Sequence, residues 1–298
     1  MKKAVVSVSL RMGCHVSIAG GLFNAPKNAS ELGCETFQIF SRSPRGGSAP
    51  EITPEIQENF KTEMEKNGLT EFVIHGPYII NFGSGNPRTY NGSISLIRQD
   101  LERGSLIGAK YVMFHVGSGK DLGAEKAIKQ AQEGLEKVLD GYTGSTKLLL
   151  ENAAGAGEVL GATFEQLAEL MKPIKKHPGF GGICYDTQHA FASGYDIRTP
   201  KAVEETFAQF EKCIGLEYLK CFQVNDSKTE LGSHKDRHEH IEDGLIGKKG
   251  FSALFAYLQR KKWTGMLILE TEHDKVQVDL KILKDLRNKS KINRPSSA

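Results

Sequence analysis

Short runs of apolar and β-branched residues recur along the chain, and longer segments with helical periodicity lie between them. Eight such runs occupy residues 12–18, 35–40, 71–75, 111–115, 147–152, 182–186, 218–224 and 266–270. Between two of them, Ile94, Ile97 and Leu101 are spaced so that they fall on one face of a helix. The runs are continuously apolar rather than alternating, which is typical of parallel strands that are covered on both faces.

This pattern predicts an α/β fold of the (β/α)₈ or TIM barrel type, as a single domain over residues 1–298. We expect the barrel to span about residues 12–287 and the basic, polar residues 288–298 to form a frayed tail. A doubly wound open sheet is the structural alternative. The stretch "VSIAGG" that ends the first run lacks the GxGxxG spacing of a dinucleotide-binding turn, which argues against that alternative.

Composition changes this picture little. The chain has 298 residues, 39% hydrophobic and 25% charged, with a formal net charge of +3, which excludes a disordered chain and a general polycation. Any nucleic-acid binding must therefore come from local basic loops.

Arg11 interrupts the apolar N-terminus, so we expect no secretory signal, and no segment is long and apolar enough for a membrane span. Five cysteines without CxxC spacing indicate reduced thiols, so we expect a cytoplasmic protein, associated with the nucleoid in a bacterium or archaeon.

Candidate chemistry gathers where the predicted strands end. Six of the eight runs end on or near an ionisable residue: His15, His75, His115, Glu151, Asp186 and Glu270. In a barrel these ends converge on one rim. A single histidine there is more often structural than a ligand, and this applies to His15. Burying all six groups together would cost too much free energy without compensating cations, so the pattern predicts a cluster of metal ions.

Further donors follow two of the strands. His189 lies just beyond Asp186, and the loop "KDRHEH" supplies Asp236 and His238, which point the same way in extended chain. Mixed nitrogen and oxygen donors favour Zn²⁺, with Mn²⁺ or Fe²⁺ as alternatives. Neighbouring ions of this kind hydrolyse phosphoesters with a metal-bound hydroxide. A metal-dependent sugar isomerase or epimerase of the same barrel type is the alternative enzyme, and a DNA-binding module without activity is the other alternative.

Several short motifs occur in a specific order: "GCHVSIAGG", "FHVGS", "ENAAGAG", "YDTQHAFASGYD", "VNDSK", "DRHEHI", "GLIG" and "LILET". Together they resemble the endonuclease IV family of metal-dependent apurinic/apyrimidinic DNA repair endonucleases, from about Met12 to Thr271. The resemblance implies three zinc ions that cut the phosphodiester 5′ to abasic sites in double-stranded DNA and leave a 3′-hydroxyl. Trimming of 3′ ends is a further activity that the sequence leaves open. We expect a monomer.

The resemblance also assigns ligands. One zinc would be held by His75, His115 and the bridging Glu151, which is also the expected catalytic residue, acting together with a metal-bound hydroxide. A second would share Glu151 and add Asp186, Glu270 and a histidine of the seventh strand. The third would take His189, Asp236 and His238. The seventh strand departs from this pattern, because Gln223 stands where the family has histidine. An amide carbonyl is a poorer zinc donor than imidazole. Either Gln223 ligates weakly or holds a metal-bound water and the cluster survives on its carboxylates, or the second site is weakly occupied or takes another metal.

Basic loops beside this rim predict DNA binding. Arg42 and Arg45 lie in the loop "SRSPRGGSAP", and Lys228, Lys235 and Arg237 lie in the loop after the seventh strand. A basic loop is usually only solvated, but around a phosphodiesterase site such cations would contact the DNA backbone. By resemblance, Arg45 enters the base stack at the lesion and Tyr78 supports the bent DNA.

Overall fold

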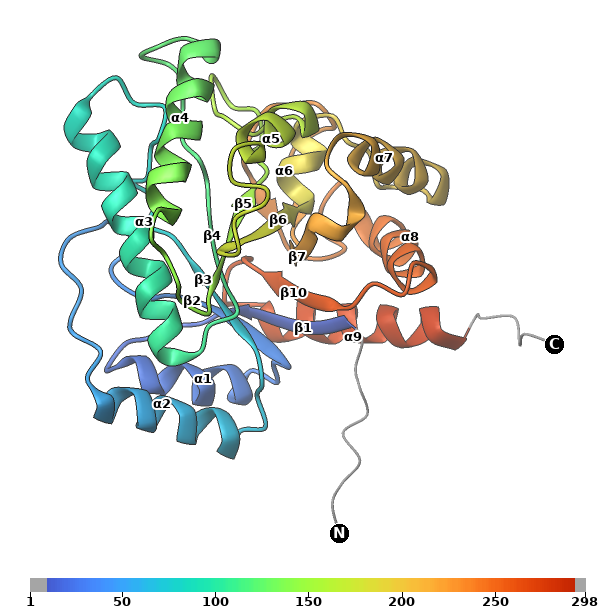
Figure 1. Cartoon of the computed structure of the whole chain (residues 1–298). Helices are drawn as coiled ribbons and strands as arrows, with labels where there is room; N and C mark the ends of the chain where they lie inside the picture. The colour runs from blue at the N-terminus through green and yellow to red at the C-terminus, as the bar shows by residue number, and fades with distance from the viewer. Residues whose placement is uncertain (1–9, 293–298) are drawn as a thin grey trace.

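The computed structural model describes residues 10–292, and its centre is a closed barrel of eight parallel strands (Figure 1). Each predicted run forms one strand: β1 (Leu10–His15), β2 (Thr36–Phe40), β3 (Phe72–His75), β4 (Tyr111–Phe114), β5 (Lys147–Glu151), β6 (Phe180–Asp186), β7 (Leu219–Gln223) and β10 (Gly265–Leu269). β10 closes the barrel by pairing with both β1 and β7. The TIM barrel prediction is therefore confirmed.

Helices surround the barrel and connect its strands (Figure 1). They are α1 (Ala25–Glu31), α2 (Pro54–Lys66), α3 (Pro87–Ile107), α4 (Ala124–Leu139), α5 (Phe164–Met171), α6 (Thr187–Ala192), α7 (Pro200–Cys213), α8 (Gly247–Arg260) and α9 (Val276–Ile292), with 3₁₀ turns η1 (Leu22–Asn24) and η2 (Leu216–Tyr218). Sequence signals explain several starts. Thr53 and Thr199 cap α2 and α7 with their side chains, and each is followed by a proline at the first helical position, where no amide hydrogen is needed.

Two features differ from the sequence prediction or extend it. α9 continues to Ile292, so residues 288–292, which were expected to begin the tail, are helical. Residues 293–298 and 1–9, including the segment tested for a secretory signal, lie outside the described residues. A short antiparallel ribbon of β8 (Asp226–Ser227) and β9 (His238–Glu239) also rises after β7. Among the described helices, none combines the length and the apolar character that a membrane crossing requires.

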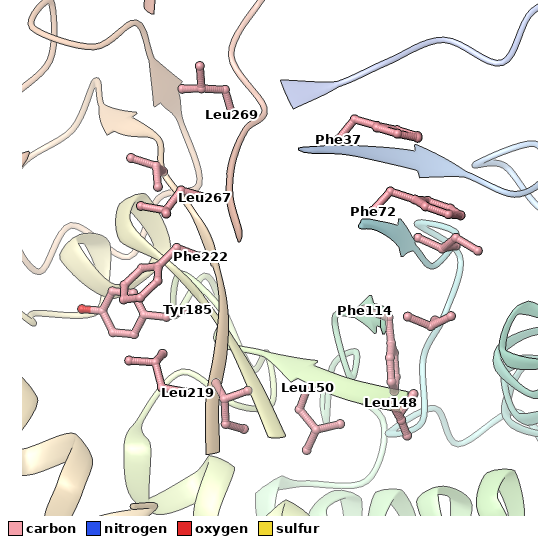
Figure 2. Packing of buried hydrophobic residues seen from close by; sticks show 14 of the residues in the cluster. Phe37, Phe72, Phe114, Leu148, Leu150, Tyr185, Leu219, Phe222, Leu267 and Leu269 are labelled. Atoms are coloured by element: carbon pink, nitrogen blue, oxygen red, sulfur yellow. The ribbon is translucent and has the colours of Figure 1, made fainter. Parts of the chain in front are cut away.

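The buried apolar residues form two layers, because successive side chains of a strand point to opposite faces. The outer layer lies between strands and helices and includes Phe37, Phe72, Phe222 and Leu267 (Figure 2). A separate cluster contains strand residues alone: Val73, Met113, Leu149, Cys184, Cys221, Met266 and Ile268. Since it includes no helix residue, it fills the interior of the barrel. This interior layer is the floor on which the polar site rests.

Candidate metal centre

Above this floor, the next inward-facing residue of each strand is polar. In a parallel pair, residues in register point to the same face, and the register pairs His15 with Gln38 and Asp186 with Gln223. Glu151 is paired with the interior Cys184, and His75 with the interior Met113. The inward row at the carboxyl ends is therefore made of His15, Gln38, His75, His115, Glu151, Asp186, Gln223 and Glu270. The strand ends converge as the sequence predicted.

Glu151 lies at the centre of three histidines. Its Oε2 is 3.2 Å from His75 Nε2, and its Oε1 is 3.4 Å from His115 Nε2 and 3.2 Å from His189 Nδ1. The carboxylate is fully buried. Burial alone would raise its pKa, but the three histidines hold the pKa of Glu151 well below its usual value. It is therefore an ionised group that faces two sets of donors at once, which is what a bridging ligand requires.

A second group of donors forms around Asp186, His189 and His238, which bring one ligand atom each to within 4.8 Å of one another. Asp236 approaches the same histidines, at 3.3 Å from His189 Nε2 and 3.5 Å from His238 Nε2. Its side chain is 52% exposed, so this side of the cluster is the open one. The structure thus brings Asp236, His189 and His238 together and places Asp186 beside them.

The loop that carries Asp236 is held by the helix that carries His189. In α6, the amide of Gln188 donates to the backbone carbonyl of Lys235 at 2.9 Å, and the backbone N–H of His234 donates to Ala192 at 2.9 Å. The β8–β9 ribbon then returns His238 to the rim. Because Asp226 accepts from the backbone N–H groups of Ile246 and Gly247, the base of the ribbon is tied to the start of α8.

Gln38, Gln223 and Glu270 form the remaining side of the site. The Nε2 of Gln38 donates to Glu270 Oε1 and also contacts His15 Nδ1 at 2.9 Å, while its Oε1 accepts from Gln223 Nε2 at 3.3 Å. Burial lowers the pKa of His15 to about 3, so this imidazole is neutral and can accept. Burial, together with the charges of Glu151 and Asp186, raises the pKa of Glu270.

The unpaired atoms of the site test whether metal ions fit it. Four buried polar atoms of the predicted ligands have no hydrogen-bond partner among residues 10–292: Glu151 Oε1, His189 Nε2, Gln223 Oε1 and His238 Nε2. Buried polar atoms are almost always paired, so four orphans in one cluster call for an explanation. The ion pairs of Glu151, Asp186 and Asp236 within the described residues are all to histidines, with no lysine or arginine among them. Divalent cations would satisfy these donors and balance these charges, so the residues present fit a metal centre.

A cleft of about 410 Å³ opens above these donors and is lined by His115, His189, Asp236, His238 and Glu270 together with Phe40 and Tyr78. Tyr78 is 69% exposed at its edge, and its ring meets that of Phe40 edge-on at 5.2 Å. The loop of Arg45 lies next to it, since the N–H of Tyr78 donates to the carbonyl of Pro44 at 2.9 Å. Arg45, Lys228, Lys235 and Arg237 are all exposed.

Arg42 requires a correction. It was expected to contact DNA from the same loop as Arg45, but its side chain is 1% exposed. Its Nε donates to Asp100 Oδ1 at 2.8 Å, and Asp100 is buried in α3. Arg42 therefore anchors the loop to α3 and does not offer its charge to a ligand at the surface.

Sequence reasoning missed three amides that orient the carboxylates. Gln38 lies within an apolar run and carried no signal of its own. Asn152 accepts from the N–H of Asp186 at 2.7 Å, and Asn225 donates to Asp186 Oδ2 at 2.7 Å while accepting from the N–H of Glu270. Asn152 is the last residue of the run 147–152 and Asn225 directly follows the run 218–224, within the motifs "ENAAGAG" and "VNDSK", and these positions were the available signal.

Comparison with known proteins agrees with this geometry. The family described as xylose isomerase-like TIM barrel matches residues 26–290. A probable endonuclease 4 of Nitrosopumilus maritimus is 38% identical over 271 residues, covering 89% of this chain and 94% of its own length. A probable endonuclease 4 of Carboxydothermus hydrogenoformans is 37% identical, covering 93% of this chain and 96% of its own length. The crystal structure of endonuclease IV from Thermus thermophilus aligns with a TM-score of 0.82 at 31% identity, over 94% of this chain and 99% of the other. A D-tagatose 3-epimerase-like protein aligns with a TM-score of 0.74 at 21% identity, over 95% of this chain and 98% of the other. This likeness shows the fold alone.

Proposed function

We propose, from the premise that this chain belongs to the endonuclease IV family, that it is a DNA repair endonuclease that cleaves the phosphodiester 5′ to abasic sites and leaves a 3′-hydroxyl. Its substrate would be double-stranded DNA. It would act as a monomer in the cytoplasm, at the nucleoid in a bacterium or archaeon. The observation that carries the proposal is the convergence of buried, unpartnered donor atoms beneath an open cleft with exposed cations beside it.

The centre would hold its ions through the donors described above. His75, His115 and Glu151 would form the first position, and His189, Asp236 and His238 the third. Glu151, Asp186, Gln223 and Glu270 would form the second. Zn²⁺ is the first expectation, with Mn²⁺ or Fe²⁺ as alternatives; when bound, such ions supply positive charge to the phosphate and lower the pKa of water.

The chain's own residues would position the substrate and the donors. Glu151 would keep two donor groups at a fixed separation, because its two oxygens already face different histidines. Asp236 and His238, on the open side, would be the donors nearest to an entering phosphodiester. The side chain of Tyr78 at the edge of the cleft would support DNA that is bent at the lesion.

DNA binding would come from the exposed cations on both sides of the cleft. Arg45 would reach the lesion from the loop after β2, where it follows the anchored Arg42. Lys228, Lys235 and Arg237 would contact backbone phosphates from the loop around the β8–β9 ribbon. Such contacts release counterions, so binding should weaken steeply with added salt. An abasic nucleotide has little stacking to lose on leaving the helix, which would favour the lesion over intact DNA.

The sugar isomerase alternative is the weaker candidate. The epimerases among the similar structures are 21% identical or less, whereas the relatives at 37% and 38% are named as endonucleases. The exposed cations beside an open cleft also suit a polyanion better than a neutral sugar.

The test is cleavage of a labelled duplex with one abasic site, scored beside turnover of an aldose or ketose. We expect incision at the lesion, with a 3′ end that a DNA polymerase extends. The matched control is the same duplex with an intact base, which should stay uncut. Sugar turnover without incision would overturn the proposal. Resection of recessed 3′ ends in the same assay would show whether the enzyme also trims.

A further inference from the structure

The three donor sets differ in chemistry. The first and third each contain two imidazoles and one carboxylate. The second, which consists of Glu151, Asp186, Gln223 and Glu270, contains oxygen donors alone. This difference comes from Gln223, and its effect depends on which atom of its amide faces the other donors. The hydrogen bonds of Gln38 with Glu270 and Gln223 determine which atom that is.

The direction of the Gln223 amide follows from the carboxylate of Glu270. The atom of Gln38 beside Glu270 Oε1 is the donor Nε2. The neutral His15 takes the second hydrogen of the same nitrogen. The oxygen of Gln38 must then be the atom that faces Gln223, and it needs a donor. Gln223 Nε2 supplies that donor at 3.3 Å, which leaves Gln223 Oε1 as the free end.

The free oxygen of Gln223 belongs to the same polar row as the carboxylates. Gln223 is fully buried, and its Oε1 has no hydrogen-bond partner within the part of the chain that the structure describes. It is in register with Asp186, so both side chains point into the barrel. An unpaired buried carbonyl oxygen is unfavourable, because it has given up its hydrogen bonds to water without replacement. A cation shared with the neighbouring carboxylates would remove that cost.

From these contacts we propose that the second position is an oxygen-only site for a hard divalent cation of the Mn²⁺ class, and that Gln38 is its positioning residue. Oxygen-only donor sets suit Mn²⁺ and Mg²⁺, whereas imidazole adds stability for Zn²⁺. Zn²⁺ binds more tightly than Mn²⁺ in most sites, but the difference in affinity depends on the ligands. Which ion occupies a site depends also on the concentration of each metal. The second position should therefore be the one that exchanges Zn²⁺ for Mn²⁺ when Mn²⁺ is in excess.

The proposal rests on the metal centre of the proposed function and is tested without DNA. Metal-free full-length protein is dialysed against Zn²⁺ with excess Mn²⁺, and its metals are counted by mass spectrometry. Anomalous diffraction at the manganese and zinc edges then locates each metal. We expect Mn²⁺ at the second position and Zn²⁺ at the first and third.

Two variants separate the roles of the glutamines. Gln223→His should exclude Mn²⁺ and take Zn²⁺ at all positions, with a Zn²⁺ affinity at the second position raised by about 10–100-fold. Gln38→Leu should lower Mn²⁺ affinity by about 10–100-fold, because the Gln223 amide is then free to turn. Gln259→Leu is the matched control, since Gln259 is also buried but bonds to Arg287 on α9, and its metal partition should equal that of wild type.

Three outcomes would overturn the inference: Zn²⁺ at every position under excess Mn²⁺, Mn²⁺ at every position alike, or the same partition in wild type and Gln223→His. If Gln38→Leu fails to fold, the Gln223→His comparison still decides. A protein that partitions its metals as expected but leaves abasic DNA intact would defeat the proposed function alone. An active endonuclease that holds only Zn²⁺ would defeat the inference alone.

Discussion

Arg42→Ala should destabilise the protein strongly, although the residue lies in a loop beside the cleft. The ion pair of Arg42 with Asp100 is almost completely buried, with side chains 1% and 0% exposed. Burial raises the pKa of Asp100, and Arg42 is the main group that opposes this. Removing one partner of a buried pair costs about 3–5 kcal/mol, because the other charge is left uncompensated. Ser41, which donates to the same oxygen at 2.7 Å, can offset only part of that cost.

The measurement is the free energy of unfolding from urea titration of metal-free protein. The double variant Arg42→Met, Asp100→Leu should recover most of the loss, since apolar replacements of a buried pair are often neutral. Lys201→Ala is the control, because the Lys201–Glu205 pair on α7 is exposed and should contribute nothing measurable. A loss below about 1 kcal/mol for Arg42→Ala, or a double variant as unstable as the single one, would refute this reasoning.

Three further outcomes test the proposed site. Prolonged chelation should abolish cleavage of abasic DNA, and Zn²⁺ or Mn²⁺ should restore it; full activity in protein shown to be metal-free by elemental analysis would contradict the metal centre. Glu151→Gln should lose both cleavage and bound metal, because a neutral amide cannot replace the charge that faces three histidines, and wild-type rates would remove Glu151 from the centre. Arg45→Ala should weaken binding to abasic duplex more than binding to intact duplex, because this side chain is expected at the lesion; equal losses on both duplexes would show that Arg45 makes no contact specific to the lesion.

The barrel and most of the polar rim could be predicted because the pattern is local. Each strand appears as a short apolar run, and its last inward residue must face the rim, whatever the rest of the chain does. Glu151 and Asp186 were found in this way. Their mutual distances depend on strand register, which the sequence pattern does not give, but convergence at one rim was enough to group them.

Contacts between distant segments could not be predicted. Arg42 and Arg45 look alike in sequence, within one glycine- and proline-rich loop. They differ because Asp100, 58 residues further along the chain, comes to lie beneath one of them. A charged residue in a loop is usually solvated, and only the packing of α3 against the loop shows that Arg42 is not.

The missed amides explain how this centre keeps its charge for cations. A carboxylate can be held in place by a lysine or an arginine, but the same contact would neutralise it and compete with a metal. Asn225 instead fixes Asp186 by donating one hydrogen and fixes Glu270 by accepting from its backbone, without adding any charge. Gln38 does the same for Glu270 and Gln223. Because an amide both donates and accepts, a row of amides can orient several acidic groups at once. The carboxylates are thereby held in place by groups that add no positive charge, so their own charge stays available to divalent cations.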